Sequence, residues 1–231
     1  MMVTKTDNDH KVGAVQTLEA ELGSVQGQDV DAQALESIAA LIKTSLRNGN
    51  SRVYTAGLAC AVVFLNVADE QWQATHSEGH STSHLDHIFK NAVHTLAVPP
   101  GGLLTFLGDA KDSVRASARA ALLQAAKTSV AISASESRLP PDQMPLAMLD
   151  KLMKEQGFAS KNAKVREQVR FLGCLYQNLS TAGSLTSVSL FGCRVFYTLP
   201  NYGQPVLHCH FEDGCPSSSM PLKIPIQSCE M

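Results

Sequence analysis

Apolar residues recur every three or four positions along the first three quarters of the chain. One such series is Leu35, Ile38, Leu41, Ile42 and Leu46. This spacing places apolar side chains on one side of an α-helix. The same spacing recurs over residues 53–67, 85–96 and 114–125, and Pro99-Pro100-Gly101-Gly102 ends the helix over residues 85–96. Because no stretch between residues 7 and 177 alternates long enough to form a strand, the pattern predicts an all-α fold.

Four segments of the chain share one layout. Each has a polar turn, an Asp or Asn suited to capping, a basic residue, a valine and then an amphipathic helix. The valines are Val12, Val53, Val114 and Val165, which lie 41, 61 and 51 residues apart. This period is near that of HEAT-type helical pairs. The sequence therefore predicts an α-α superhelix of about four HEAT-like repeats over residues 7–178, with residues 75–84 (T-H-S-E-G-H-S-T-S-H) as an insertion loop.

The third copy, L-G-D-A-K-D-S-V-R at residues 107–115, suggests how the repeats are joined. Gly108 permits a turn, and Asp112 is expected to cap a helix that begins near Ser113. This assignment places the cap one residue closer to the valine than in the other copies. In the first copy, the polar residues 7–11 are interpreted as a turn. Only six residues precede that turn, so the first repeat is expected to lack most of its leading helix.

Stacked repeats place their internal turns along one edge of the array. The residues expected to form a binding surface on this edge are Arg47, Asn50, Arg52, Lys111, Arg115, Lys161, Asn162, Lys164 and Arg166. A single Lys or Arg beside a helix start usually serves only solubility. The recurrence of positive charge at successive turns instead favours recognition of an extended acidic protein surface.

The helical pattern stops near residue 178, and residues 179–231 are rich in helix breakers and β-branched residues. Four of the six cysteines fall in this segment. Val195, Phe196 and Tyr197 are compatible with a short strand, for which no partner strand is predicted. We expect a divergent, irregular or disordered tail in place of further repeats.

Composition excludes several classes of function. The net charge is only -2, so no overall basic field would recruit nucleic acid or a membrane. The sequence shows neither a signal-peptide core nor an unbroken apolar run that could cross a bilayer. Cys60 and Cys174 lie in helical apolar stretches, which favours reduced thiols and an intracellular location. The sequence thus predicts a soluble intracellular protein that binds neither nucleic acid nor membrane.

Two histidine-rich segments are candidate zinc sites. The first contains His76, His80, His84 and His87 with Asp86. Gly79 and the neighbouring Ser and Thr residues favour a solvated loop there. The second contains His208, Cys209, His210 and Cys215, whose spacing differs from that of structural zinc sites. Since nucleophile, acid-base and phosphate-loop motifs are also lacking, we predict no enzyme, cofactor or metal.

The segment L-G-D-A-K-D-S-V-R, together with N-G-N-S-R-V and S-K-N-A-K-V-R-E, resembles the N-terminal TOG array of the CLASP family of microtubule-associated proteins. The resemblance covers about Asp7 to Gln177. It implies an armadillo-like helical array whose intra-repeat turns contact tubulin, and a non-catalytic role in microtubule stabilisation, spindle assembly and cell division. It also implies a location in the cytoplasm, on microtubules and the spindle.

Two departures from the family pattern qualify these expectations. The first turn, K-T-D-N-D-H-K, lacks the large apolar residue that TOG arrays use to bind free tubulin, and the one tryptophan, Trp72, lies elsewhere. Fifth and sixth repeats are replaced by the tail. The expected partner is therefore tubulin, the microtubule lattice or a microtubule-associated adaptor. The alternatives are a HEAT-type scaffold without tubulin contact and a zinc-dependent protein built on the tail.

Overall fold

The computed structural model describes residues 5–25, 30–78, 83–135, 140, 143–182, 193–198 and 206–211. The chain divides into two compact units, Met1–Leu172 and Gly173–Met231. The helices are α1 (Lys5–Ser24), α2 (Ala32–Leu46), α3 (Ser51–Ser77), α4 (Ser83–Ala97), α5 (Leu103–Phe106), α6 (Asp112–Ala134), α7 (Pro145–Leu152), the π-helix η2 (Met153–Phe158) and α8 (Ala163–Ala182). The all-α prediction for the array is confirmed.

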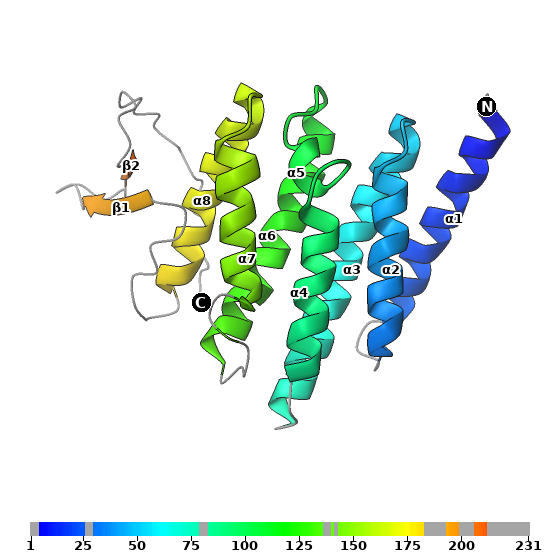
Figure 1. Cartoon of the computed structure of the whole chain (residues 1–231), viewed down its shortest axis with the longest axis horizontal. Coiled ribbons are helices and arrows are strands. Elements are labelled where there is room, and N and C mark those ends of the chain that lie inside the picture. Colours follow the sequence, from blue (N-terminus) through cyan, green and yellow to red (C-terminus); the bar gives the residue numbers. More distant parts are fainter. Residues whose placement is uncertain are drawn as a thin grey trace, which may run out of the picture. The chain divides into compact units, whose positions relative to one another are not determined.

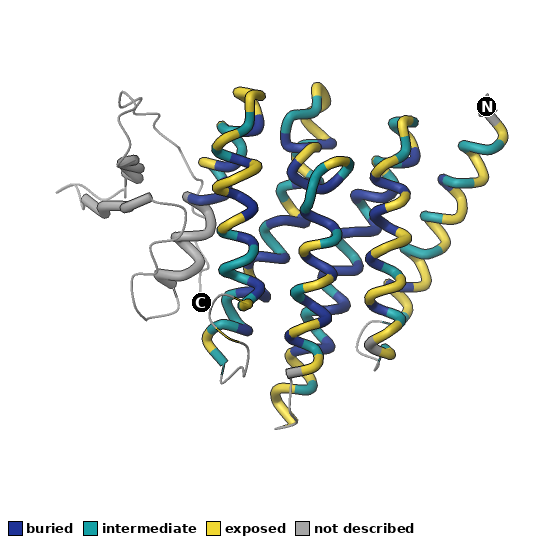
Figure 2. Tube along the Cα trace, viewed as in Figure 1, coloured by how far each residue is buried: buried dark blue, intermediate teal, exposed yellow. Residues whose placement is uncertain are grey.

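The first unit has two layers of helices. In Figure 1, α2, α4 and α7 form one layer, and α1, α3 and α6 lie behind them. Helix α3 contacts α1, α2 and α6, while α4 packs against α2 and α7. Buried segments face the space between the layers, and exposed segments gather on the outside and at the turns (Figure 2). The pairs α2 with α3 and α4 with α6 therefore follow the predicted helical-repeat arrangement.

The described part of the second unit contains two short strands, β1 (Cys193–Thr198) and β2 (Val206–Phe211). They pair antiparallel, with Cys193 opposite Phe211 and Thr198 opposite Val206. The expected strand at residues 195–197 is thus present, whereas its partner strand was not predicted. The other residues of the predicted 179–231 tail, apart from the end of α8, lie outside the described residues.

Apolar stripes hold the layers together as the periodicity predicts. In α2, the side chains of Leu35, Ile42 and Leu46 are each at most 3% exposed. Leu41, which the sequence placed in the same series, is 60% exposed because it lies outside this stripe. In α3, Cys60 is a buried free thiol, and burial raises its pKa to about 12. This environment agrees with the predicted reduced cysteine, whereas the side chain of Cys174 lies outside the described residues.

Two predicted loops are helical instead. Residues 7–11 lie inside α1, where Lys11 pairs with Asp7 at 2.6 Å across one helical turn. Such an i,i+4 pair favours helix, which is why the polar run does not break it. Residues 75–77 likewise belong to α3, and the ring of His76 stacks on Trp72 with centroids 5.1 Å apart. The predicted insertion is shorter than residues 75–84, and residues 79–82 lie outside the described residues.

Helix α3 is long and apolar enough in composition to cross a bilayer, although its sequence contains no unbroken apolar run of that length. Half of its most apolar window is buried inside the array. The helix packs against α1, α2, α4 and α6. Its central position among these helices accounts for its apolar composition.

Helix α3 packs tightly against α2 at Gly57. A Cβ atom at this position would lie 2.2 Å from the Ser45 hydroxyl oxygen, which donates a buried hydrogen bond to the Ile42 carbonyl oxygen. We expect Gly57→Ala to lower the free energy of unfolding by about 1–3 kcal/mol through overpacking. Denaturant unfolding monitored by circular dichroism measures this change.

Two further variants serve as controls for Gly57→Ala. Adding Ser45→Ala should restore part of the loss because it removes the clashing oxygen. Gly13→Ala, in α1, places its Cβ where no atom lies within 4 Å, and it should stabilise the protein by about 0.5–1 kcal/mol. Equal effects of the two glycine substitutions would contradict the close packing of α2 on α3.

Candidate functional site

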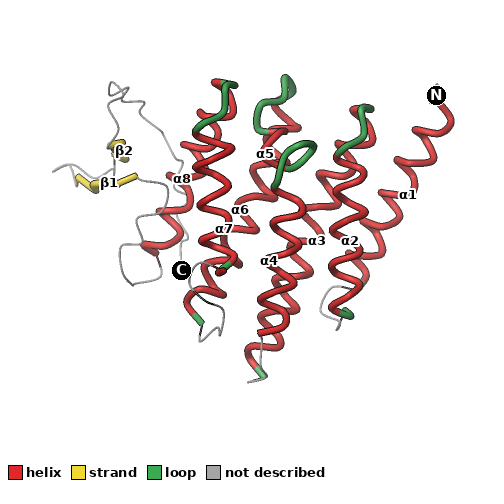
Figure 3. Tube along the Cα trace, viewed as in Figure 1, coloured by secondary structure: helices red, strands yellow, loops and turns green. Residues whose placement is uncertain are grey.

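Three turns lie at the same end of the array and form what we call the turn edge: residues 47–50, 98–111 and 159–162 (Figures 1 and 3). The Arg47 Nε atom donates to the Pro100 carbonyl oxygen at 3.4 Å, and the Tyr54 hydroxyl donates to Asp109 at 3.3 Å. A Cβ on Gly108 would lie 2.4 Å from the Asn162 amide nitrogen. These contacts confirm that successive turns are neighbours along one edge.

The first and last of these turns are closed by the same pair of hydrogen bonds. Asn48 accepts from the Asn50 amide at 2.9 Å, and Asn50 accepts from the Arg52 amide at 2.9 Å. In the last turn, Ser160 accepts from the Asn162 amide at 3.2 Å, and Asn162 accepts from the Lys164 amide at 3.0 Å. The predicted contact residues Asn50 and Asn162 therefore use their side-chain oxygens to cap α3 and α8.

The middle turn departs from this pattern at Lys111. Asp109 accepts from the Lys111 amide at 2.8 Å, but Lys111 itself is the N-cap residue of α6 and provides no side-chain cap. Asp112 is the first residue of α6, so its predicted capping role is wrong. Counted from the valine, Asn50, Lys111 and Asn162 occupy the same position. The N-cap position therefore lies three residues before the valine at all three helices. At α6 this position is occupied by the cation Lys111 and not by a capping residue.

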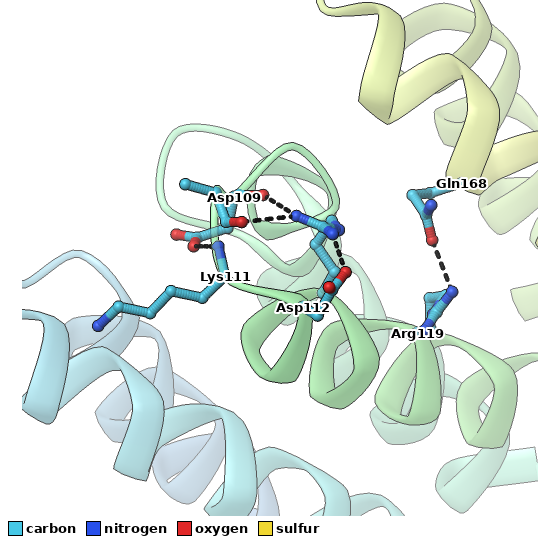
Figure 4. Close-up of polar contacts among 7 residues, drawn as sticks. Asp109, Lys111, Asp112, Arg119 and Gln168 are labelled. Carbon is cyan, nitrogen blue, oxygen red and sulfur yellow. Dashed lines mark hydrogen bonds and ion pairs between the residues drawn. The ribbon is translucent and has the colours of Figure 1, made fainter.

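The arginines of the turn edge are directed at the protein itself. Arg115 donates to the carbonyl oxygens of Asp109 at 2.5 Å and Ala110 at 2.9 Å. It also pairs with the Asp112 carboxylate (Figure 4). Its side chain is only 14% exposed. Arg166 donates to the Ser160 carbonyl oxygen at 2.6 Å, again six residues upstream. The two arginines thus fasten the turns that precede their helices.

Two further arginines also have partners. Arg52 pairs with Asp9 of α1 at 2.5 Å, although its side chain remains 63% exposed. Arg47 reaches the Pro100 carbonyl, as described above. Such exposed contacts contribute little to stability, about 0–1 kcal/mol. The Asp9 carboxylate nonetheless offsets the positive charge of Arg52, whereas the Pro100 carbonyl restricts the direction of Arg47 without changing its charge.

The lysines of the turn edge differ from the arginines. Lys111, Lys161 and Lys164 are exposed, and no ion pair or hydrogen bond of their ammonium groups is found among the described residues. Figure 4 shows the Lys111 side chain extending away from Asp109 and Asp112. The turn edge is therefore less basic than the sequence indicated, and its available positive charge is concentrated at the second and third turns.

The histidines considered as zinc ligands are not brought together in the described part of the chain. Across residues 6–25, 30–78, 84–135 and 143–173, no group of three His, Cys, Asp or Glu side chains could hold a metal ion. Asp86, one of the candidates, is buried and accepts a hydrogen bond from the Trp72 indole at 2.8 Å. His80 and the side chains of His208, Cys209, His210 and Cys215 lie outside the described residues.

Comparison with known proteins finds one informative similarity. The chain is 30% identical over 166 residues to Protein STU1 of Mycosarcoma maydis, an alignment that covers 69% of this chain and 12% of that protein. No protein-family model matches the chain, and no solved structure matches it. The similarity to STU1 supports the CLASP relationship that the turn motifs indicate. The chain spans only a small part of the relative's length.

The N-cap position of α6 gives a test on stability. Replacing Lys111 by Asn supplies the side-chain acceptor that Asn50 and Asn162 provide at the equivalent positions. It also removes a cation from the positive end of the helix dipole. We expect Lys111→Asn to raise the free energy of unfolding by about 0.5–2 kcal/mol, measured by denaturant unfolding.

A substitution that removes the cap at an equivalent position is the matched control. Asn50→Ala removes a cap that is present, and it should lower the free energy of unfolding by about 0.5–2 kcal/mol. A Lys111→Asn variant no more stable than the parent would show that α6 does not gain a cap at this position.

Proposed function

We propose that the chain is a helical-repeat segment of a CLASP-type, microtubule-associated protein, and that its turn edge contacts tubulin in the microtubule lattice. In this proposal the segment has no catalytic role and acts in microtubule dynamics and spindle assembly, in the cytoplasm. The similarity to STU1 and the turn motifs support the family relationship. The activity of STU1 as a whole is not carried over, since the chain matches only 12% of its length.

The observation that carries the proposal is the set of three exposed lysines, Lys111, Lys161 and Lys164, on neighbouring turns. Their ammonium groups have no partner among the described residues, whereas the nearby arginines Arg115 and Arg166 are turned inward. Charges on the rim of a protein steer association and fix orientation with an oppositely charged partner. A row of such charges fits an acidic and extended protein surface.

The start of α1 explains why the lattice is proposed over free tubulin. Thr6, Asp9 and His10 are exposed there, and residues 6–11, whose side chains the structure describes, include no large apolar side chain that could serve as an anchor. Interfaces usually derive most of their affinity from a few buried aromatic, apolar or arginine anchors. A contact made of solvated lysines is weak. On a polymer, a chain that dissociates from one site finds the next site close by, which does not hold for a partner free in solution.

Co-sedimentation of the chain with stabilised microtubules across a salt series tests this proposal. Binding of the parent chain should weaken as salt rises, because exposed charges are screened. The combined variant Lys111→Glu, Lys161→Glu, Lys164→Glu should lose about tenfold or more in affinity, equal to about 1.4 kcal/mol. Arg115 and Arg166 are left unchanged, since reversing them would disturb the turns themselves.

A matched control separates the site from net charge. Lys127 is exposed on α6, far along the helix from the turn edge. Lys127→Glu changes the net charge as much as Lys111→Glu does, but it should leave binding unchanged. Equal losses of microtubule affinity in Lys127→Glu and Lys111→Glu would show that the turn edge is not the contact surface. Binding that resists high salt would instead favour an apolar scaffold interface.

A further inference from the structure

Tyr54 connects two repeats at the turn edge. It lies in the first turn of α3, yet its hydroxyl donates to the Asp109 Oδ2 atom, in the turn before α6, at 3.3 Å. Its ring packs on the buried Phe106 of α5, with ring centroids 5.0 Å apart and planes tilted by 38°. Burial and the neighbouring Asp109 carboxylate raise the pKa of Tyr54, so the hydroxyl remains a donor at physiological pH.

The Asp109 carboxylate links Tyr54 to the main chain of Lys111. One of its carboxylate oxygens accepts from Tyr54, and the other accepts from the Lys111 amide at 2.8 Å. The Asp109 backbone carbonyl in turn accepts from Arg115 at 2.5 Å. The main chain at Lys111 is therefore attached to the second repeat through Asp109 and Tyr54. Arg115 holds the same turn to α6. Figure 4 shows the contact between Asp109 and Lys111.

This attachment matters because α6 begins without a side-chain cap. The other two helices that follow the turns are capped by Asn50 and Asn162. At α6, the Asp109 carboxylate and the Arg115 guanidinium are the groups that hold the turn. The direction in which the Lys111 side chain leaves the protein thus depends on a carboxylate that Tyr54 holds from the neighbouring repeat.

We propose that Tyr54 is a positioning residue for the turn edge: through Asp109 it fixes the start of α6 and orients Lys111 toward a partner. This inference deepens the proposed function and, in its binding aspect, rests on it. Fixing a contact residue before association lowers the entropy lost on binding. Two neighbouring turns then act as one preformed contact.

Tyr54→Phe tests the positioning directly, because it keeps the ring against Phe106 and removes only the hydroxyl. Hydrogen exchange of the segment 107–115 should become about threefold faster or more, because Tyr54 no longer holds the Asp109 carboxylate that accepts from the Lys111 amide. Ser133→Ala removes a hydroxyl whose hydrogen bond stays within α6, to Ser129 at 2.8 Å, and it should leave this exchange unchanged. Unchanged exchange in Tyr54→Phe would overturn the inference.

A double-mutant cycle tests whether Tyr54 acts through Lys111. Microtubule co-sedimentation is measured for the parent chain, Tyr54→Phe, Lys111→Ala and the double variant. Tyr54→Phe should weaken binding about threefold, or about 0.65 kcal/mol, in the parent and have no effect when Lys111 is alanine. An equal loss in both backgrounds would mean a merely structural role and would overturn the inference.

The two proposals can fail separately. If the parent chain does not pellet with microtubules, the proposed function fails, whereas the exchange measurement still decides whether Tyr54 holds the turn. If the parent chain pellets but Tyr54→Phe changes neither exchange nor binding, only the positioning role is lost.

Discussion

The burial of α3 between neighbouring helices is the constraint on which the array depends. Leu58, Cys60 and Phe64 are fully buried at its centre, and the helix contacts α1, α2, α4 and α6. Fully burying one large apolar side chain contributes about 1.5–3 kcal/mol. The small residue Gly57 lets α2 approach closely enough for this burial. Once the helices are stacked in this way, the turns that join them must lie along a common edge.

The different chemistry of arginine and lysine explains how that edge is organised. A guanidinium group offers five donors in a rigid plane and can satisfy several carbonyl oxygens of one turn, as Arg115 does with Asp109 and Ala110. An ammonium group is compact and strongly hydrated, so it is better placed in water. The arginines therefore maintain the shape of the turns, and the lysines carry the charge that an incoming surface can meet.

The sequence predicted the helices and the alignment of the turns, because apolar periodicity and the Pro-Gly stop at 99–102 act locally. It failed where two local signals compete. Asp7 and Asp9 look like capping residues, yet Asp7 pairs with Lys11 inside a continuous helix. Asp109 and Asp112 are both plausible at the start of α6, and only the contact with Tyr54, 55 residues away in sequence, distinguishes their roles.

The same limit applies to the candidate site. Nine residues were predicted from charge and spacing, and sequence alone could not tell which side chains turn back onto the protein. Arg166 and Lys164 are two residues apart and equally basic, but Arg166 reaches the Ser160 carbonyl oxygen and Lys164 does not. Tyr54 was missed because its position beside an apolar helix start carries no functional signal. Its hydroxyl gains a role only when a carboxylate from the next repeat is brought to it.

The energetics of such an edge constrain the kind of binding it can support. An exposed ion pair contributes about 0.2–1 kcal/mol, so three lysines supply roughly 0.6–3 kcal/mol. A dissociation constant of 1 μM corresponds to about 8 kcal/mol. The turn edge is thus too weak to capture a dissolved partner tightly on charge alone, whereas a lattice of closely repeated acidic surfaces keeps further sites near a chain that has just dissociated. Fixing Lys111 in advance matters most in this regime, because a weak contact is easily cancelled by the entropy of ordering it.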